Sequence, residues 1–213
     1  MKRINWRYAI GELLIVIVGI TVAFALNNWA GHIKDRDLEK AYLESIKSDL
    51  QNDIEQLDSN IVRLKSRMTY LNQLRPHLYA RIPNRDSMGL RIFSITDPVS
   101  FYPQENTIQS MQFSGDLKLI KDLDLKNEII AHYSGYDQVK IEVERHAHFA
   151  KDYLADYYMR EIDYTKFGTE EGFNYLDDPY FHNLVYALAG IYSTEYQAQQ
   201  EALVSAEKMM AKL

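Results

Sequence analysis

A stretch of uncharged, mostly aliphatic residues from Leu13 to Leu26, close to the start of the chain, constrains the fold more than any other feature. Its fourteen residues are short for a membrane span, which needs about 20. The uncharged residues 8–11 just before it bring the segment to roughly that length, at about 1.5 Å per residue. The sequence therefore predicts one transmembrane helix within an N-terminal anchor of residues 1–31.

Both ends of this segment carry residues that favour the lipid headgroup region. A helix places its two tryptophans about 35 Å apart, at the levels where amphipathic indole rings lie between lipid and water. A pair of asparagines closes the far side. The predicted interfacial anchors are Trp6, Asn27, Asn28 and Trp29.

A cleaved signal peptide is the alternative interpretation of the same segment. Basic residues precede the apolar run, and Ala23-Phe24-Ala25 fits a small-x-small cleavage site. Glu12 at the start of the run and Trp29 just beyond it favour a retained anchor. Both interpretations export the rest of the chain, and the basic residues before the span predict a cytoplasmic N-terminus. In a Gram-negative bacterium we therefore expect a single-pass inner-membrane protein with residues 32–213 in the periplasm.

One face of the predicted span carries small residues at helical spacing. Gly11, Gly19 and Ala23 share a stripe, on which another helix could approach closely. Small residues are common in membrane helices, so an ordinary lipid-facing stripe remains the alternative. Glu12 lies near the cytoplasmic edge, where it either reaches water and Arg7 or makes a polar contact to a partner helix. The predicted membrane-packing residues are Gly11, Glu12, Gly19 and Ala23.

Two motifs flank the span, Tyr8-Ala9-Ile10-Gly11-Glu12 before it and Leu26-Asn27-Asn28-Trp29 after it. In these motifs the chain resembles an uncharacterised family of bacterial single-pass membrane proteins, which open with a YAIGE-like motif and reach an NNW motif after the span. Residues 114–120 and 127–130 resemble a second, looser patch of that family, whereas Ala25-Leu26 stands where members usually have Gln-Ile. The resemblance implies a retained anchor followed by a helical domain. It implies no activity, because the family has no assigned function.

The exported part begins with a long predicted helix from Ile33 to about Leu74, without Gly or Pro. Its apolar residues recur in steps of three and four, the heptad pattern of helices that pack side by side. They are Leu43, Ile46, Leu50, Ile54, Leu57, Ile61, Leu64, Met68 and Leu71. Two interpretations fit: an antiparallel helix in a bundle, or a parallel homo-oligomeric coiled coil leading out of the membrane. Pro76 is expected to end the helix, and the prolines between residues 76 and 105 predict a long connection.

More helices are predicted after this connection. A short helix over residues 106–113 is followed by Asp116 as an N-cap, and Asp124 caps a longer segment reaching about Ile162. Asp178, followed by proline, is the start signal of a last helix that runs to the C-terminus. The predicted fold class is therefore mainly α, with one N-terminal transmembrane helix followed by a long-helix, coiled-coil-like bundle.

His146 and His148 form an HxH pattern of the kind found in metal sites. On a helix, side chains two residues apart point about 200° apart, so the pair cannot hold one ion and a solvated face is expected. The chain has no cysteine, which excludes thiolate ligands and nucleophiles. Without any catalytic signature, we expect no metal, no cofactor and no enzymatic activity. A net charge of -6 argues against binding nucleic acid.

Tyrosines gather in the second half of the chain, between Tyr133 and Tyr196. Helical spacing brings some of these aromatic rings together, and two interpretations remain open. The rings form either an aromatic core with hydroxyls at its edge or a surface for a ligand or partner. The candidate residues of such a surface are Phe149, Tyr153, Tyr157 and Tyr164.

The leading functional hypothesis is a non-enzymatic, membrane-anchored interaction, scaffold or accessory subunit, with a protein partner or a second copy of the chain. Only about seven residues precede the predicted span, so a signal crossing the membrane is expected to pass through another protein's helix. The alternative is a periplasmic ligand-sensing module with a Tyr-rich pocket, which signals through a partner membrane protein.

Overall fold

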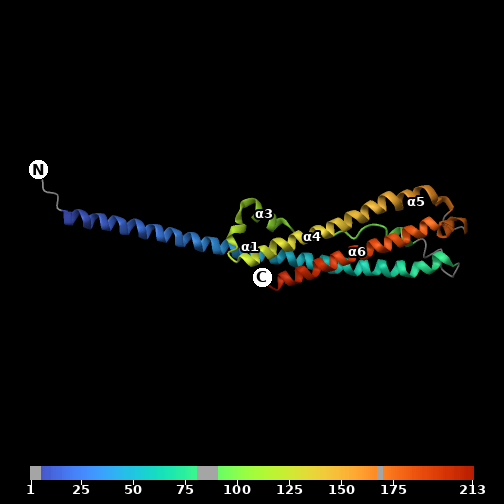
Figure 1. Cartoon of the computed structure of the whole chain (residues 1–213), viewed down its shortest axis with the longest axis horizontal. Helices are drawn as coiled ribbons and strands as arrows, with labels where there is room; N and C mark the ends of the chain where they lie inside the picture. The colour runs from blue at the N-terminus through green and yellow to red at the C-terminus, as the bar shows by residue number, and fades with distance from the viewer. Residues whose placement is uncertain (1–5, 81–90, 167–169) are drawn as a thin grey trace.

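The computed structural model describes residues 6–80, 91–166 and 170–213. Three long helices form its body: α1 (Trp6–Tyr79), α4 (Leu123–Phe149) and α6 (Pro179–Met210) (Figure 1). The shorter elements are α3 (Asn106–Ser114), the π-helical turn η3 (Ala150–Ala155), α5 (Asp156–Glu161) and the 3₁₀ helices η1 (Ile92–Ser94), η2 (Asp116–Leu119), η4 (Tyr164–Lys166) and η5 (Glu170–Asp177). No strand occurs among the residues described, which confirms the mainly α prediction.

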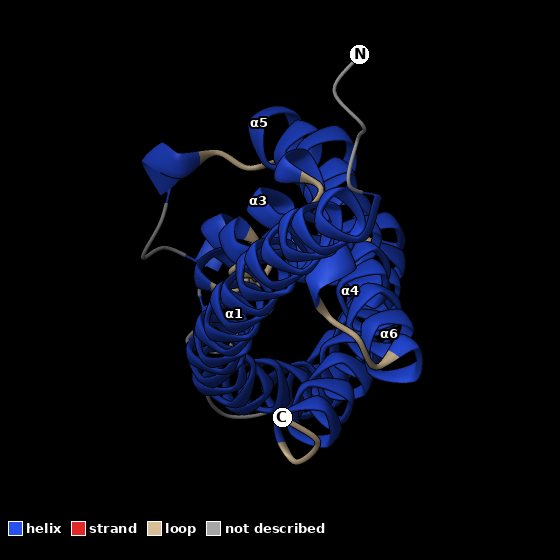
Figure 2. Ribbon diagram, turned by 90° about the vertical axis from the view of Figure 1, so that its left-hand side faces the viewer, coloured by secondary structure: helices blue, strands red, loops and turns tan. Residues whose placement is uncertain are grey.

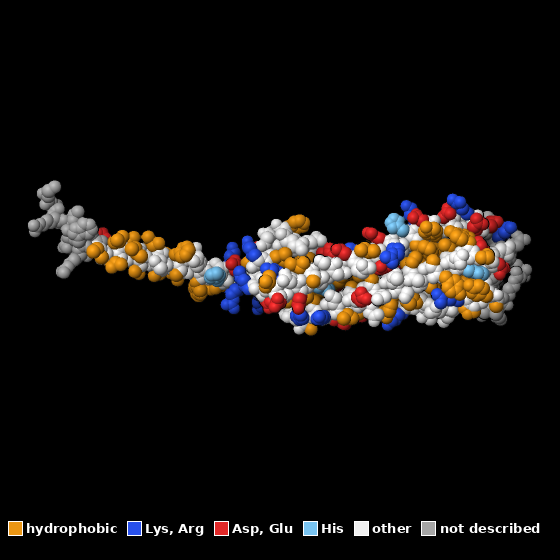
Figure 3. All heavy atoms as spheres, in the orientation of Figure 1, with side chains coloured by type: hydrophobic (Ala, Val, Ile, Leu, Met, Phe, Trp, Pro, Cys, Tyr) orange, Lys and Arg blue, Asp and Glu red, His pale blue; other side chains and the backbone are white. Residues whose placement is uncertain are grey.

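Helix α1 extends far beyond the rest of the molecule towards the N-terminus (Figure 1). Its 74 residues correspond to about 110 Å at 1.5 Å per residue. Apolar side chains surround the part outside the bundle (Figure 3), and those from Ile10 to Trp29 are exposed. Among the residues described, this is the one helix that is long and apolar enough to cross a membrane, by length and composition. The predicted span is therefore a candidate membrane helix, and it continues past residue 31 into the bundle without a break.

In the bundle, α1 and α4 both pack against α6, which runs back antiparallel to them (Figures 1 and 2). The buried face of α1 follows the predicted pattern in steps of three and four. Its fully buried side chains include Ile46, Leu50, Leu57, Leu64 and Leu71. These residues form the α1 side of a helical bundle, as the first of the two interpretations predicted. Burying one such side chain stabilises the fold by about 1.5–3 kcal/mol.

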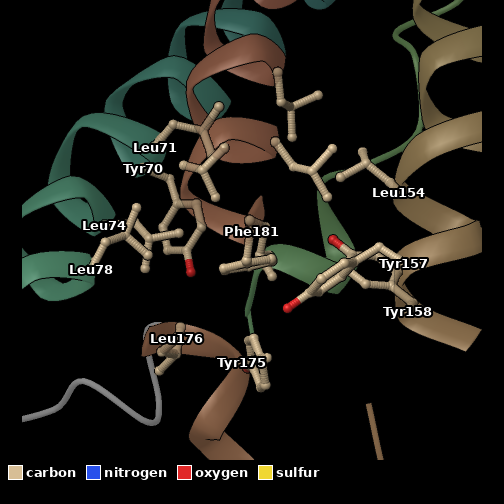
Figure 4. Close-up of a cluster of buried hydrophobic side chains, with 14 of the residues drawn as sticks. Tyr70, Leu71, Leu74, Leu78, Leu154, Tyr157, Tyr158, Tyr175, Leu176 and Phe181 are labelled. Carbon is tan, nitrogen blue, oxygen red and sulfur yellow. The ribbon is translucent and has the colours of Figure 1, made fainter. Parts of the chain in front are cut away.

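The bundle interior has two apolar clusters along its length. One lies next to the point where α1 leaves the bundle and includes Ile46, Leu50 and Met209. The other lies at the far end and includes Leu71, Leu74 and Phe181 with several tyrosines (Figure 4). Between them the interior is partly polar, and this polar section is where the candidate site lies.

The prediction that Pro76 ends the first helix is wrong, because α1 continues to Tyr79 with the proline inside its last turns. A proline removes one backbone hydrogen bond and crowds the preceding turn. Leu74 before it and Leu78 after it are both buried in the far cluster, and this packing holds the last turn in place. The connection predicted over residues 76–105 therefore begins after the helix. Residues 81–90 of that connection lie outside the described part of the chain.

Two predicted N-caps are wrong. The cap of α4 is Asp122 and not Asp124, because the Asp122 carboxylate accepts the N–H groups of Asp124 (2.9 Å) and Leu125 (3.0 Å). Asp116 follows the left-handed Gly115 and starts η2, and its carboxylate accepts the Tyr42 hydroxyl at 2.9 Å instead of capping a helix.

The other local predictions agree with the structure. The helix expected over residues 106–113 is α3, and it ends at Gly115, whose φ of 75° favours glycine. The segment expected to reach Ile162 is helical through η3 and α5 as far as Glu161. Asp178 caps α6 by accepting the Tyr180 N–H at 2.8 Å.

An extended segment, residues 95–105, runs along the bundle between η1 and α3, and we call it the strap. Side chains of α1 contact its backbone in reverse order: Arg67 at Asp97, Asn60 at Ser100, Gln56 at Tyr102 and Asp53 at Gln104. From Asp97 to Gln104 the strap advances seven residues, while α1 advances fourteen residues from Asp53 to Arg67. Fourteen helical residues are about 21 Å long, so the strap rises about 3 Å per residue. The strap is therefore nearly fully extended and antiparallel to α1.

Candidate functional site

The polar section of the interior is organised around the strap. Seven polar or charged side chains are buried among the residues described. Five of them hydrogen-bond to the strap backbone: Asp53, Asn60, His146, Glu195 and Gln199. An extended segment packed along a helical bundle has no neighbouring strand for its N–H and C=O groups, and buried backbone groups need partners. Side chains of three helices supply those partners.

The centre of this site is a buried contact between a histidine of α4 and a glutamate of α6. His146 Nδ1 lies 2.6 Å from Glu195 Oε2, and both side chains are 0% exposed. The other ring nitrogen, Nε2, donates to the Thr96 carbonyl at 2.9 Å. Glu195 Oε1 accepts the Val99 N–H at 2.7 Å, and Gln199 donates to the Val99 carbonyl at 2.7 Å. The pair therefore joins two helices and holds the strap at the Thr96 carbonyl and the Val99 N–H, while Gln199 holds the Val99 carbonyl.

The expectation of a solvated face for the HxH pattern is wrong for His146, although His148 is exposed as expected. His146 faces inward because α4 buries one residue every three or four positions. That series includes Ile129, Tyr133, Tyr136 and Val139, and it continues to His146. The same periodicity in the sequence is the signal that places His146 on the buried face.

Asp53 on α1 holds the end of the strap next to α3. Its carboxylate accepts the Gln104 N–H at 2.8 Å and the Tyr136 hydroxyl at 3.0 Å. Burial raises the pKa of Asp53 from 3.8 to about 6, and the two hydrogen bonds only partly oppose this rise. Gln56, one turn further along α1, accepts the Tyr102 N–H at 2.6 Å.

Arg67 and Tyr192 hold the other end of the strap. The Arg67 guanidinium donates to the Asp97 carbonyl and, at 3.1 Å, to the Tyr192 hydroxyl, and it lies over the Tyr192 ring. The Tyr192 hydroxyl in turn donates to the Ile95 carbonyl. Sequence reasoning missed this role of Arg67, Asn60 and Asp53. Their spacing of seven residues on α1, beside the apolar seam, is the pattern that marks a polar stripe.

A groove of about 390 Å³ lies beside the strap, where Thr96, Asp97 and Pro98 form one wall. The other wall comes from the end of α4, the π-helical turn and α5, where alanines leave space between longer side chains. This wall consists of Ala147, Ala150, Lys151, Leu154, Ala155 and Tyr158. Single π-helical turns inside α-helices occur frequently at functional sites. The groove therefore places an unusual helix turn, a small-residue wall and the strap together.

The four aromatic residues proposed as a ligand or partner surface do not form one surface. Tyr157 is buried, donates to Asp178 at 2.7 Å and stacks on Phe181 (Figure 4). Phe149 and Tyr153 stack on each other at 5.5 Å, with Tyr153 exposed. Tyr164 is exposed on the separate helix η4.

Residues of the predicted membrane-packing stripe lie on the part of α1 outside the bundle. A Cβ atom added at Gly11 or Gly19 meets no atom within 4 Å, and Glu12 and Ala23 are exposed. Of the predicted interfacial anchors, Trp29, Asn27 and Asn28 are exposed on the same helix, and the side chain of Trp6 lies outside the described part. None of the described side chains in these two sets is covered by the rest of the chain.

Within the described ranges, no group of three or more His, Asp or Glu residues could hold a metal ion. A smaller cavity of about 230 Å³ lies between α4 and α6 near the C-terminus, and it is lined by His132, Ser205 and Lys208, among others. His132 Nδ1 contacts the Ser205 hydroxyl at 2.8 Å, and Nε2 has no partner. Burial lowers the pKa of His132 from 6.5 to about 4, so the ring is neutral.

Comparison with known proteins matches residues 12–138 to a family described as a family of unknown function, DUF6090. This match covers the candidate span, the strap and most of α4, but not α6. The protein translocase subunit SecA from Helicobacter pylori (strain HPAG1) is 29% identical over 136 residues. That alignment covers 59% of this chain, which spans only 14% of the SecA length. No solved structure matches the chain.

Proposed function

This chain belongs to the DUF6090 family, whose function is unknown, and we propose that it is a non-enzymatic, membrane-anchored interaction, scaffold or accessory subunit. In this proposal, residues 1–31 hold it in a bacterial inner membrane, and the bundle lies in the periplasm. The observation that carries the proposal is α1, one helix that passes from its exposed apolar part into the bundle. Uninterrupted helices bend only gently, so a rotation or shift of the span is passed to the bundle. This geometry suits a subunit that acts through contacts of both parts with a partner.

The use of the buried polar groups supports a role without chemistry. Three of the five buried acids and histidines in the described part of the chain, Glu195, His146 and Asp53, bond to the strap backbone. Of the other two, Glu142 pairs with Arg145 and His132 contacts the Ser205 hydroxyl. Groups engaged in this way hold the fold together. A general base needs a free approach to the proton that it removes.

The contact that we propose in the membrane is the stripe of Gly11, Gly19 and Ala23, together with Glu12. The side chains along this face are not covered by the chain itself. In lipid, small residues let two helices approach closely, and a polar residue gains a partner across the contact. The occupant is a helix of another membrane protein or a second copy of this chain.

The test compares the full chain with two variants after extraction from membranes in mild detergent. Gly19→Leu fills the stripe, whereas Ala25→Leu adds similar bulk on the side of the helix opposite Ala23. We expect all three chains to stay in the membrane pellet without detergent. A defined partner or dimer, measured by native mass spectrometry, should be retained by the wild type and Ala25→Leu and lost in Gly19→Leu.

Two results contradict the proposal. A chain that is freely soluble after lysis without detergent has no membrane anchor. An assembly that survives Gly19→Leu unchanged does not use the stripe.

A second candidate function, ligand sensing in the periplasm, is favoured by the groove beside the strap. Its volume of about 390 Å³ falls in the range of small-molecule sites. Of the tyrosines near the far end, Tyr158 lines it. A panel of small metabolites should contain a compound that raises the melting temperature of the wild type and not of Ala150→Leu, which narrows the groove. If every compound acts equally on both chains, the groove is not a ligand site.

A further inference from the structure

His146 differs from an ordinary buried histidine because both of its ring nitrogens face acceptors. The Thr96 carbonyl oxygen can only accept, so Nε2 carries a hydrogen. The contact of 2.6 Å between Nδ1 and Glu195 Oε2 also needs one hydrogen, which lies on either atom. With that single hydrogen the pair is neutral overall, as an imidazolium with a carboxylate or as an imidazole with a carboxylic acid.

The surroundings isolate this shared proton from solvent. Both side chains are 0% exposed, and the Tyr192 ring meets the His146 ring edge-on at 4.8 Å. Charged side chains on the elements packed against the pair include Asp97 of the strap, which is exposed, Arg67 of α1 and Glu142 of α4. On α1, Arg67 bonds to Tyr192 and to the carbonyl of Asp97 in the strap. On α4, the carboxylate of Glu142 pairs with Arg145 at 2.8 Å.

We propose that His146 and Glu195 form a one-proton latch, which holds the strap when the pair shares a single proton and releases it when that proton is lost or a second one is added. Loss of the proton leaves a buried carboxylate facing the bare lone pair of Nδ1. Addition of a second proton leaves two donors facing each other and an unpaired buried cation. Each change breaks the contact that orients both side chains towards Thr96 and Val99, because an uncompensated buried charge is strongly destabilising.

Release of the latch changes the groove as well as the strap. Thr96 and Pro98 line the groove, and both lie within the strap section 96–99 that the pair holds at its two ends. The shape of the groove is therefore coupled to the protonation of two side chains that do not line it. This coupling is separate from the proposed membrane role, since it needs neither a span nor a partner.

Hydrogen exchange of the full chain in detergent micelles tests the latch between pH 4 and pH 11. Rates at the Val99 N–H are divided by the intrinsic chemical rate at each pH. We expect protection of the Val99 N–H to be greatest at an intermediate pH and to fall towards both lower and higher pH. We call these two falls the acid limb and the alkaline limb. Within each limb, the equilibrium constant for opening of the strap should rise about tenfold per pH unit. The Gln104 N–H, which Asp53 accepts, serves as an internal control and should lack the alkaline limb. Flat protection of Val99 over the whole range overturns the proposal.

Glu195→Gln is the matched variant, because its amide can accept the Val99 N–H and donate to Nδ1 of a neutral imidazole. We expect this variant to lose the alkaline limb and keep the acid limb. A purely structural contact would instead shift protection equally at all pH values. Persistence of the alkaline limb in Glu195→Gln would show that another group titrates, and the latch would be wrong.

Nitrogen-15 spectra of the wild-type histidine rings provide a test that needs no variant. Between pH 6 and pH 8, His146 should give one unchanging pair of ring resonances, both of hydrogen-bonded nitrogens. Exposed His148, two residues away, provides the spectrum of a solvent-exposed histidine in the same sample. If His146 behaves like His148 over this range, its proton is not held in the pair.

Discussion

Replacing Asp53 by asparagine should stabilise the protein at neutral pH, although it removes a carboxylate that accepts two hydrogen bonds. Burial raises the pKa of Asp53 from 3.8 to about 6, so the folded state binds a proton more tightly than the unfolded state. The stabilisation from that proton is complete below pH 3.8 and is lost as the pH rises through 6. At 1.36 kcal/mol per pH unit, the ionised carboxylate costs the folded state about 3 kcal/mol at pH 7.

Asparagine keeps the geometry without the charge. Its oxygen can accept the Gln104 N–H, and its amide can donate to the Tyr136 hydroxyl, both of which contact the carboxylate now. Allowing about 1 kcal/mol for the weaker neutral hydrogen bonds, we expect Asp53→Asn to be about 2 kcal/mol more stable than the wild type at pH 7. The difference should shrink to near zero at pH 4.

His132 acts in the opposite direction over nearly the same pH range. Burial lowers its pKa from 6.5 to about 4, so its contribution to stability is present above pH 6.5 and is lost as the pH falls through 4. The contribution of His132 to the stability is also about 3 kcal/mol. In the wild type the two effects nearly cancel between pH 6.5 and pH 4. Asp53→Asn should therefore reveal a loss of about 3 kcal/mol over that range, and the double variant with His132→Phe should not show it.

Urea unfolding of the full chain in detergent micelles, followed by circular dichroism at pH 7 and pH 4, measures these differences. The change in unfolding free energy between the two pH values is compared across the variants. A cavity or packing cost lowers the stability equally at both pH values, so it cancels in this comparison. An Asp53→Asn chain that is less stable than the wild type by the same amount at both pH values would refute the reasoning. Asp53 would then be a favourable ionised acceptor.

Three substitutions test other parts of the fold by thermal unfolding of the same chain. Asp178→Ala removes the N-cap of α6 and the acceptor of the Tyr157 hydroxyl, so we expect it to lower the stability by about 2–3 kcal/mol. A loss below about 0.5 kcal/mol would contradict the cap. Leu71→Ala empties a fully buried position and should cost about 2–5 kcal/mol, whereas a neutral result would place α1 outside the core. Gly115→Ala meets no steric contact but forces a left-handed backbone on alanine, which should cost about 1–2 kcal/mol, and no cost would contradict the turn.

The sequence predicts the parts of this fold that depend on neighbours along the chain. The buried face of α1 follows from apolar steps of three and four, because side chains at that spacing share one side of a helix. The start of α6 follows from Asp178 and the proline after it, since an N-cap acts on N–H groups only two or three residues away. The cap of α4 shows the limit of such signals. Asp122 and Asp124 both fit the pattern, and only the position of the first turn decides between them.

Contacts between distant residues were not predictable in the same way. His146 and Glu195 lie 49 residues apart, and nothing local to either one indicates the other. The strap resembles an ordinary proline-containing loop in the sequence, although it packs against the bundle with Val99 and Phe101 buried. Its burial follows from the polar side chains that three helices turn inward, and each of these alone is typical of a solvated face. The candidate site therefore becomes visible only when the helices are placed together.

The most direct test of this account is a distance across the point where α1 enters the bundle. The chain has no cysteine, so spin labels at Ala30→Cys and Val62→Cys, both exposed positions, report on these two sites alone. In full-length protein in lipid bilayers, pulsed electron paramagnetic resonance should give one narrow distance of about 48 Å, the length of 32 helical residues. A broad distribution, or a distance well below that value, would show that the span and the bundle are joined by a hinge.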